Sequence, residues 1–90
     1  ADMLLLECVP RATTLKLLEA VSVPVIGIGA APECDGQVLV VHDMLGITHG
    51  KAARFVKNFM AEADSIQDAL RAYDAAIKEG HFPGPEHCFS

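Results

Sequence analysis

Residues 3–10 have the sequence Met3-Leu4-Leu5-Leu6-Glu7-Cys8-Val9-Pro10, an apolar run that ends in an acid, a cysteine and a proline. We predict a buried strand over residues 3–9, with Pro10 in the first turn of a following helix, where its missing N–H costs nothing. Burying an ionised carboxylate is costly unless it is paired. Glu7 is therefore either a reacting group at the carboxyl end of a parallel strand or a solvated loop acid just past it.

The next residues predict a helix and a second strand. Apolar residues recur at helical spacing from Arg11 to Val21, and residues 23–30 then form the apolar run Val23-Pro24-Val25-Ile26-Gly27-Ile28-Gly29-Ala30. A strand, a helix of about three turns and a second strand make a βαβ unit, whose parallel strands need cover on both faces. The chain is therefore predicted to be α/β.

The valine-rich residues 37–43, Gln37-Val38-Leu39-Val40-Val41-His42-Asp43, favour a third strand. Only a short turn, residues 31–36, separates them from the second strand, whereas a parallel crossover normally takes a dozen residues or more. A short helix capped by Asp35 and ended by Gly46 is the competing assignment. We predict the strand.

The remainder is predicted to be helical up to Gly80. A first apolar stripe comprises Ala52, Phe55, Val56, Phe59 and Met60. Ser65 and Asp68 resemble a capping box that opens a second helix. Its predicted apolar face comprises Ile66, Ala69, Leu70, Tyr73 and Ile77. The tail from His81 to Ser90 is predicted to be irregular.

Composition limits the classes of function. The 90 residues carry a net charge of −5, which argues against binding to nucleic acid or to an anionic membrane surface. We find neither a transmembrane span nor a signal peptide in the sequence. Three widely spaced cysteines fit a reduced, cytoplasmic setting. A hydrophobic content of 51% is high for so short a chain and predicts surfaces that are buried against further chain or other copies.

Four short motifs are weak signals of chemistry. Gly27-Ile28-Gly29 lacks the third glycine of a dinucleotide fingerprint, so close approach of backbone or ligand is the better interpretation. The histidines and cysteines show no zinc-ligand spacing, and no metal ligand is predicted. His42-Asp43 could orient an imidazole or bind a polar ligand, although such a pair is more often structural. Cys8 is predicted to be buried and inert.

Several blocks of the sequence, in order and spacing, resemble the ketopantoate hydroxymethyltransferase family. They are Leu4-Leu5-Leu6-Glu7-Cys8-Val9-Pro10, Ile26-Gly27-Ile28-Gly29-Ala30, Asp35-Gly36-Gln37-Val38-Leu39-Val40, His42-Asp43-Met44-Leu45-Gly46, Phe55-Val56-Lys57-Asn58-Phe59 and Glu86-His87-Cys88-Phe89. The resemblance covers essentially all 90 residues. One departure is Ala31, where the family usually has a glycine, and this change would alter the loop geometry.

The resemblance implies a (β/α)8 TIM barrel of the phosphoenolpyruvate/pyruvate type, of which residues 1–90 would be the C-terminal third. A complete barrel takes about 250 residues. Residues 3–9 would be strand six, residues 23–30 strand seven and residues 37–43 the region of strand eight, followed by the C-terminal helices. The rest of the barrel would be absent, and the chain would form a single segment.

The implied activity is that of a transferase of pantothenate (coenzyme A) biosynthesis. It moves a hydroxymethyl group from 5,10-methylenetetrahydrofolate to 3-methyl-2-oxobutanoate and gives 2-dehydropantoate. By resemblance Glu7 is the catalytic carboxylate and Val40 a substrate contact. The family's Mg²⁺, a Lewis acid that the keto acid chelates, would be bound by carboxylates outside this segment, and family members form large homo-oligomers, which suggests a decamer. The segment alone would be inactive. The alternative is a non-catalytic α/β interaction module that retains the barrel sequence.

Overall fold

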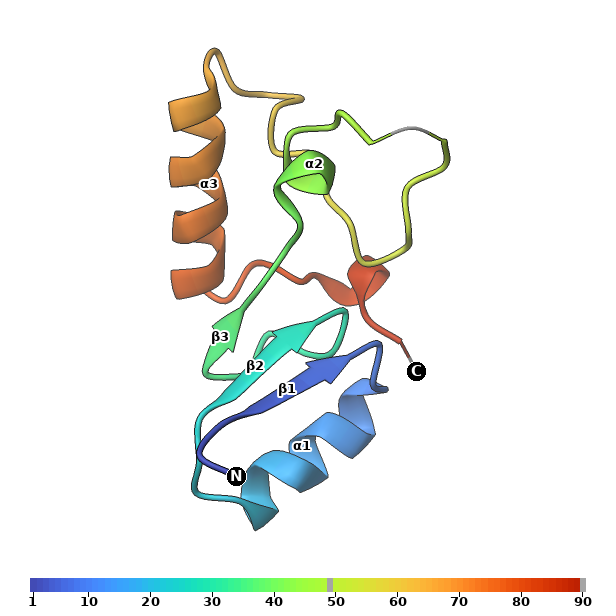
Figure 1. The fold of residues 1–90 in the computed structure, drawn as a ribbon, viewed down its shortest axis with the longest axis vertical. Helices are drawn as coiled ribbons and strands as arrows, with labels where there is room; N and C mark the ends of the chain where they lie inside the picture. The colour runs from blue at the N-terminus through green and yellow to red at the C-terminus, as the bar shows by residue number, and fades with distance from the viewer. Residues whose placement is uncertain (49, 90) are drawn as a thin grey trace.

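The computed structural model describes residues 1–48 and 50–89, which form a small parallel sheet with a helix on one face and a separate helical layer beside it (Figure 1). In chain order the elements are β1 (Leu4–Glu7), α1 (Arg11–Ala20), β2 (Val25–Ile28), β3 (Gly36–Gln37), α2 (Val41–Met44), α3 (Ile66–Lys78) and the 3₁₀ helix η1 (Pro85–His87). The sheet order is β1-β2-β3, and both pairings are parallel. The α/β class is confirmed.

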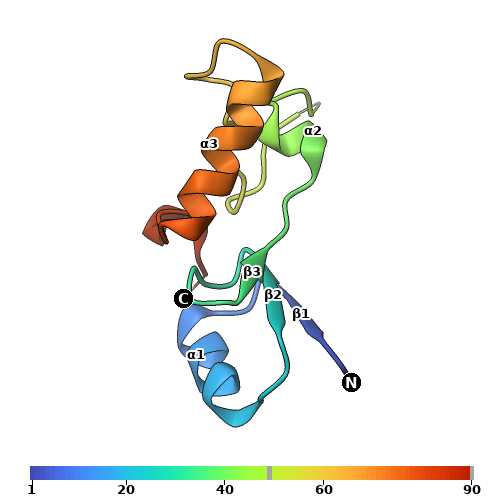
Figure 2. The same cartoon turned by 90° about the vertical axis from the view of Figure 1, so that its left-hand side faces the viewer.

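The predicted βαβ unit is present. Leu4 pairs with Val25 and Glu7 with Ile28, and α1 joins the two strands. Leu4, Leu6 and Val25 pack on the α1 side of the sheet, in a cluster with Leu18 of α1. Figure 2 shows α1 on one side of the strands only. The opposite face carries Leu5, whose side chain is 60% exposed, because successive strand residues point to opposite faces.

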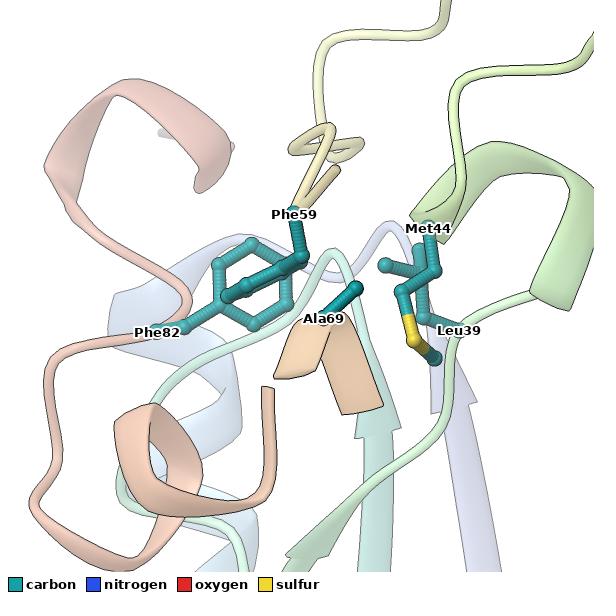
Figure 3. Packing of buried hydrophobic residues seen from close by; sticks show 5 residues of the cluster. All are labelled: Leu39, Met44, Phe59, Ala69 and Phe82. Carbon is teal, nitrogen blue, oxygen red and sulfur yellow. The ribbon is translucent and has the colours of Figure 1, made fainter. Parts of the chain in front are cut away.

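The third strand predicted over residues 37–43 is wrong for most of its length. Only Gly36 and Gln37 are in β3, and the Val38 amide donates to the Gly27 carbonyl (3.0 Å) before the chain leaves the sheet. Residues 41–44 instead form α2, whose N-cap is Val40 rather than the Asp35 of the alternative assignment. Burial is the physical reason: Leu39 and Met44 are buried in the second core, away from the sheet (Figure 3).

The second core lies between α2, α3 and the segment that follows α3. Its buried members are Leu39, Met44, Phe59, Ala69 and Phe82 (Figure 3). The Phe59 ring meets Tyr73 and Phe82 edge to face, with centroids 5.3 and 5.4 Å apart, the arrangement that aromatic quadrupoles favour. This cluster holds residues 39–82 together.

The helix predicted over residues 52–60 is also wrong, because these residues form turns. The Asn58 side chain accepts from the Met60 amide (2.9 Å), a local bond that competes with helix. The Phe59 amide donates to the Met44 carbonyl (2.8 Å), which fixes the segment on α2. Phe59 of the apolar stripe is buried because its turn inserts it into the core, and not because it lies on one face of a helix.

The helix predicted from Ser65 is confirmed as α3. The Ser65 hydroxyl accepts from the Asp68 amide (3.1 Å), and Gly80 follows the helix with φ +75°. Ala69 and Tyr73 pack on the core as predicted, whereas Leu70 is exposed together with Ile66. Among the described residues, none of the helices combines the length and apolar character needed to cross a membrane.

Candidate functional site

Glu7 ends β1 and lies on the sheet face that α1 leaves uncovered. It pairs with Ile28 at the carboxyl end of β2, and it shares its face with Leu5 because side chains alternate along a strand. Glu7 is exposed in this chain. The arginine–carboxylate and lysine–carboxylate pairs among residues 1–48 and 50–89 are Arg11–Glu33, Arg71–Asp68 and Lys78–Asp74. Glu7 is therefore in none of the ion pairs of the described residues.

The loop after Glu7 is held in one conformation by hydrogen bonds. Cys8 has φ +56°, in the left-handed region that is uncommon for residues other than glycine. Its amide donates to the Ile28 carbonyl (2.9 Å), so the parallel ladder continues past β1. Thr14 is fully buried, and its hydroxyl lies 3.2 Å from the Pro10 carbonyl. Together these contacts hold the loop in one conformation. A strained residue such as Cys8 persists where the surrounding structure fixes it in this way.

No sequence signal predicts the left-handed conformation of Cys8. The predicted burial of Cys8 is wrong, because its side chain is half-buried. Cys34 and Cys88 are the buried cysteines, and burial raises the pKa of both thiols. All three cysteines, which lie among the described residues, are free thiols.

Gly27 and Gly29, near the end of β2, permit the close approach predicted from the sequence. A Cβ on Gly27 would lie 2.9 Å from the Cys34 sulfur. Gly29 has φ +63°, and a Cβ there would lie 2.8 Å from the Phe55 Cβ. The approaching group at Gly29 is thus Phe55 of the same chain, which covers the end of β2 next to Ile28.

We predict that Gly29→Ala destabilises the protein by about 2–5 kcal/mol, the sum of a left-handed alanine and an overpacked contact. Gly80→Ala is the matched control, because Gly80 also has positive φ but no atom lies within 4 Å of its added Cβ. The control should cost only about 1–2 kcal/mol. Thermal unfolding of both variants of the complete protein measures the difference, and equal midpoints would contradict the Phe55 contact.

Val40 lies on the other side of β2 from Glu7. It is the N-cap of α2 and its side chain is 52% exposed. Because β2 stands between β1 and β3, Glu7 is the last residue of one outer strand and Val40 lies three residues past the other. Both extend from carboxyl ends of parallel strands, the edge at which open and closed α/β folds bind ligands.

The His42-Asp43 pair is a structural feature of α2. The Asp43 carboxylate accepts from the Thr48 hydroxyl, and the His42 carbonyl accepts from the Ile47 amide (2.9 Å). His42 is exposed. Asp43 therefore fixes the turn after α2, and Thr48 is its partner rather than the imidazole.

The described residues do not fit a metal ion. Within residues 1–48 and 50–89, no three histidine, cysteine, aspartate or glutamate side chains are grouped to hold one. His49 lies outside the described residues. Glu7 is a single carboxylate, whereas a divalent hard cation takes several oxygen ligands.

Comparison with known proteins gives one consistent match. The family model of ketopantoate hydroxymethyltransferase matches residues 1–85. A 3-methyl-2-oxobutanoate hydroxymethyltransferase of Alcanivorax borkumensis is 63% identical over 87 residues, which are 97% of this chain and 33% of that protein. Proteins of the same name from Chromohalobacter salexigens and Neisseria meningitidis are each 58% identical, over 99% and 100% of this chain and 34% of theirs. The chain thus spans about a third of the length of these curated relatives.

Proposed function

Because this chain belongs to the ketopantoate hydroxymethyltransferase family, we propose that the complete protein transfers a hydroxymethyl group to 3-methyl-2-oxobutanoate. The donor is 5,10-methylenetetrahydrofolate and the product is 2-dehydropantoate, a step of pantothenate biosynthesis. The activity belongs to the complete protein, since the chain corresponds to a third of its relatives.

We propose that residues 1–90 form the last part of a (β/α)8 barrel, with β1, β2 and β3 as strands six to eight. Three parallel strands in sequential order, with a helix packed on one face, support this placement. The uncovered face then becomes the barrel interior, where the exposed Leu5 would be buried by side chains from other strands. The eighth strand in this chain is short, because only Gly36 and Gln37 pair with β2.

Glu7 is the proposed general base. The observation that carries this role is its position: it projects into the proposed interior, at the carboxyl end of a parallel strand. The carboxylate takes the proton from C3 of the keto acid, and the electron pair of that C–H bond becomes available to C3. C3 then bonds to the one-carbon unit and water supplies its hydroxyl group. The two C–N bonds that hold this carbon to the folate break, and the two nitrogens take up the C3 proton and the remaining proton of the water as tetrahydrofolate leaves. A positioned base contributes about 10²–10⁴-fold to such a step.

The proposed site also includes a substrate contact and a metal ion. Val40 is the proposed substrate contact, and its exposed side chain beside the carboxyl edge supports this. The family's Mg²⁺ has no ligand set among the described residues, so we assign its ligands to segments outside this chain. We also propose a cytoplasmic homo-oligomer, and the free thiols and the exposed apolar residues Ile66 and Leu70 are in keeping with it.

The test is an assay of the complete protein with Mg²⁺, 5,10-methylenetetrahydrofolate and 3-methyl-2-oxobutanoate. We expect formation of 2-dehydropantoate. The matched control substrate is 3,3-dimethyl-2-oxobutanoate, which carries no hydrogen on C3 and should give no product. Absence of product from the branched keto acid would contradict the proposal and favour a non-catalytic interaction module.

A further inference from the structure

The C-terminal segment Gly84–Phe89 returns to the start of α1. The Phe89 carbonyl accepts a hydrogen bond from the Arg11 amide (3.0 Å), and Figures 1 and 2 both show the segment after η1 running toward the N-terminal end of α1. The Arg11 amide is one of the N–H groups that a helix leaves without an internal partner. The far end of the chain thus satisfies the first N–H of α1.

This contact lies close to Glu7 along the chain. Three residues, Cys8 to Pro10, separate Glu7 from Arg11. The β2 carbonyl at Ile28 holds Cys8, and the Thr14 hydroxyl reaches the Pro10 carbonyl. The Phe89 carbonyl holds the loop at a third position, the Arg11 amide, where the loop enters α1.

The C-terminal segment is itself anchored. His87 Nδ1 accepts from the Gly84 amide (3.1 Å), and its ring packs on Phe82 with centroids 5.0 Å apart. Burial lowers the pKa of His87, which favours the neutral ring that can accept this bond. The Arg54 guanidinium lies over the Phe89 ring, 5.6 Å from its centroid. These contacts make the segment a fixed support rather than a loose tail.

We infer that the segment Gly84–Phe89 is a positioning element for Glu7, acting through the hydrogen bond from the Arg11 amide to the Phe89 carbonyl. The inference rests on the proposed role of Glu7 as the base. A reacting group displaced by about 1 Å can lose about 10²-fold in rate. A loop anchored at its exit holds the Glu7 carboxylate against such a displacement.

Two substitutions at Arg11 in the complete protein isolate this hydrogen bond. Arg11→Pro removes the N–H and puts ring atoms against the Phe89 carbonyl. Proline is tolerated at the first helical position, and Pro10 already has the extended conformation (φ −53°, ψ 142°) that a following proline requires. Arg11→Ala is the control, because it keeps the N–H and loses only the exposed ion pair with Glu33.

We expect kcat of Arg11→Pro to be about 10- to 100-fold below that of Arg11→Ala. The KM for 3-methyl-2-oxobutanoate should change much less than kcat, because a displaced base weakens the transition state rather than the binding of the keto acid. A variant that had lost only stability would show a lower thermal midpoint, but its kcat would not fall more than its KM changes. Equal kcat in the two variants would overturn the inference.

A second variant, Phe89→Ala, removes the ring under Arg54 that anchors the segment at the acceptor residue. It should lower kcat in the same direction, and combining it with Arg11→Pro should add little, because both changes act through the same hydrogen bond. Additive losses would overturn the inference. Glu7→Gln, measured in the same series, distinguishes failure of this inference from failure of the proposed role of Glu7. If Glu7→Gln leaves proton exchange at C3 unchanged, Glu7 is not the base, whatever the Arg11 variants show.

Discussion

Replacing Glu7 by glutamine in the complete protein is expected to lower kcat by about 10²–10⁴-fold, the usual contribution of a positioned base. Glutamine keeps the size and most of the hydrogen-bonding capacity of the side chain, but it cannot take up the C3 proton. The KM should change much less than kcat, because the lost interaction belongs to the transition state. Stability should stay level or rise slightly, since the change removes a charge from an apolar strand end.

Exchange of the C3 proton of 3-methyl-2-oxobutanoate with solvent, measured without the folate, isolates the proposed proton transfer. The control is Glu19→Gln, the same change at an exposed position of α1 away from the carboxyl edge of the sheet. It should exchange at the wild-type rate. Wild-type exchange in Glu7→Gln would instead make Glu7 a solvated loop acid.

The isolated 90-residue chain is expected to have no detectable transferase activity and not to persist as a monomer. Glu7 alone is an incomplete site, since the described residues offer no metal ligand set beside it. One face of the sheet lacks a covering layer and exposes Leu5. Exposed apolar surface and open strand edges favour association.

Sedimentation of the purified chain, with the complete protein assayed in parallel, tests both parts of this expectation. We expect species heavier than the 9.6 kDa monomer and no folate-dependent turnover. A monodisperse monomer with cooperative unfolding would contradict the expected association. Turnover by the isolated chain would contradict the assignment of essential groups to the missing segments.

The local sequence determined those helices and strands for which hydrophobic pattern, proline placement and capping residues all indicate the same structure. The β1–α1–β2 unit follows from two apolar runs around a helical repeat, with Pro10 at the point where the helix begins. The start of α3 follows from Ser65, because its hydroxyl caps the helix through a contact within the same turn. Glu7 could be singled out for the same reason: an acid that ends an apolar strand is anomalous within a few residues of sequence.

Only the tertiary structure determined the conformation of those segments whose apolar residues could be buried in either of two ways. Residues 37–43 have the valine content of a strand, yet burial of Leu39 beside α3 draws them out of the sheet. Phe59 is buried from a turn rather than from a helix face, because it packs against rings distant in sequence. The hydrogen bond from the Arg11 amide to the Phe89 carbonyl joins residues far apart in the sequence, and no local pattern specifies it. Local propensities differ by less than the free energy of burying one large side chain, so long-range packing determines the structure of such segments.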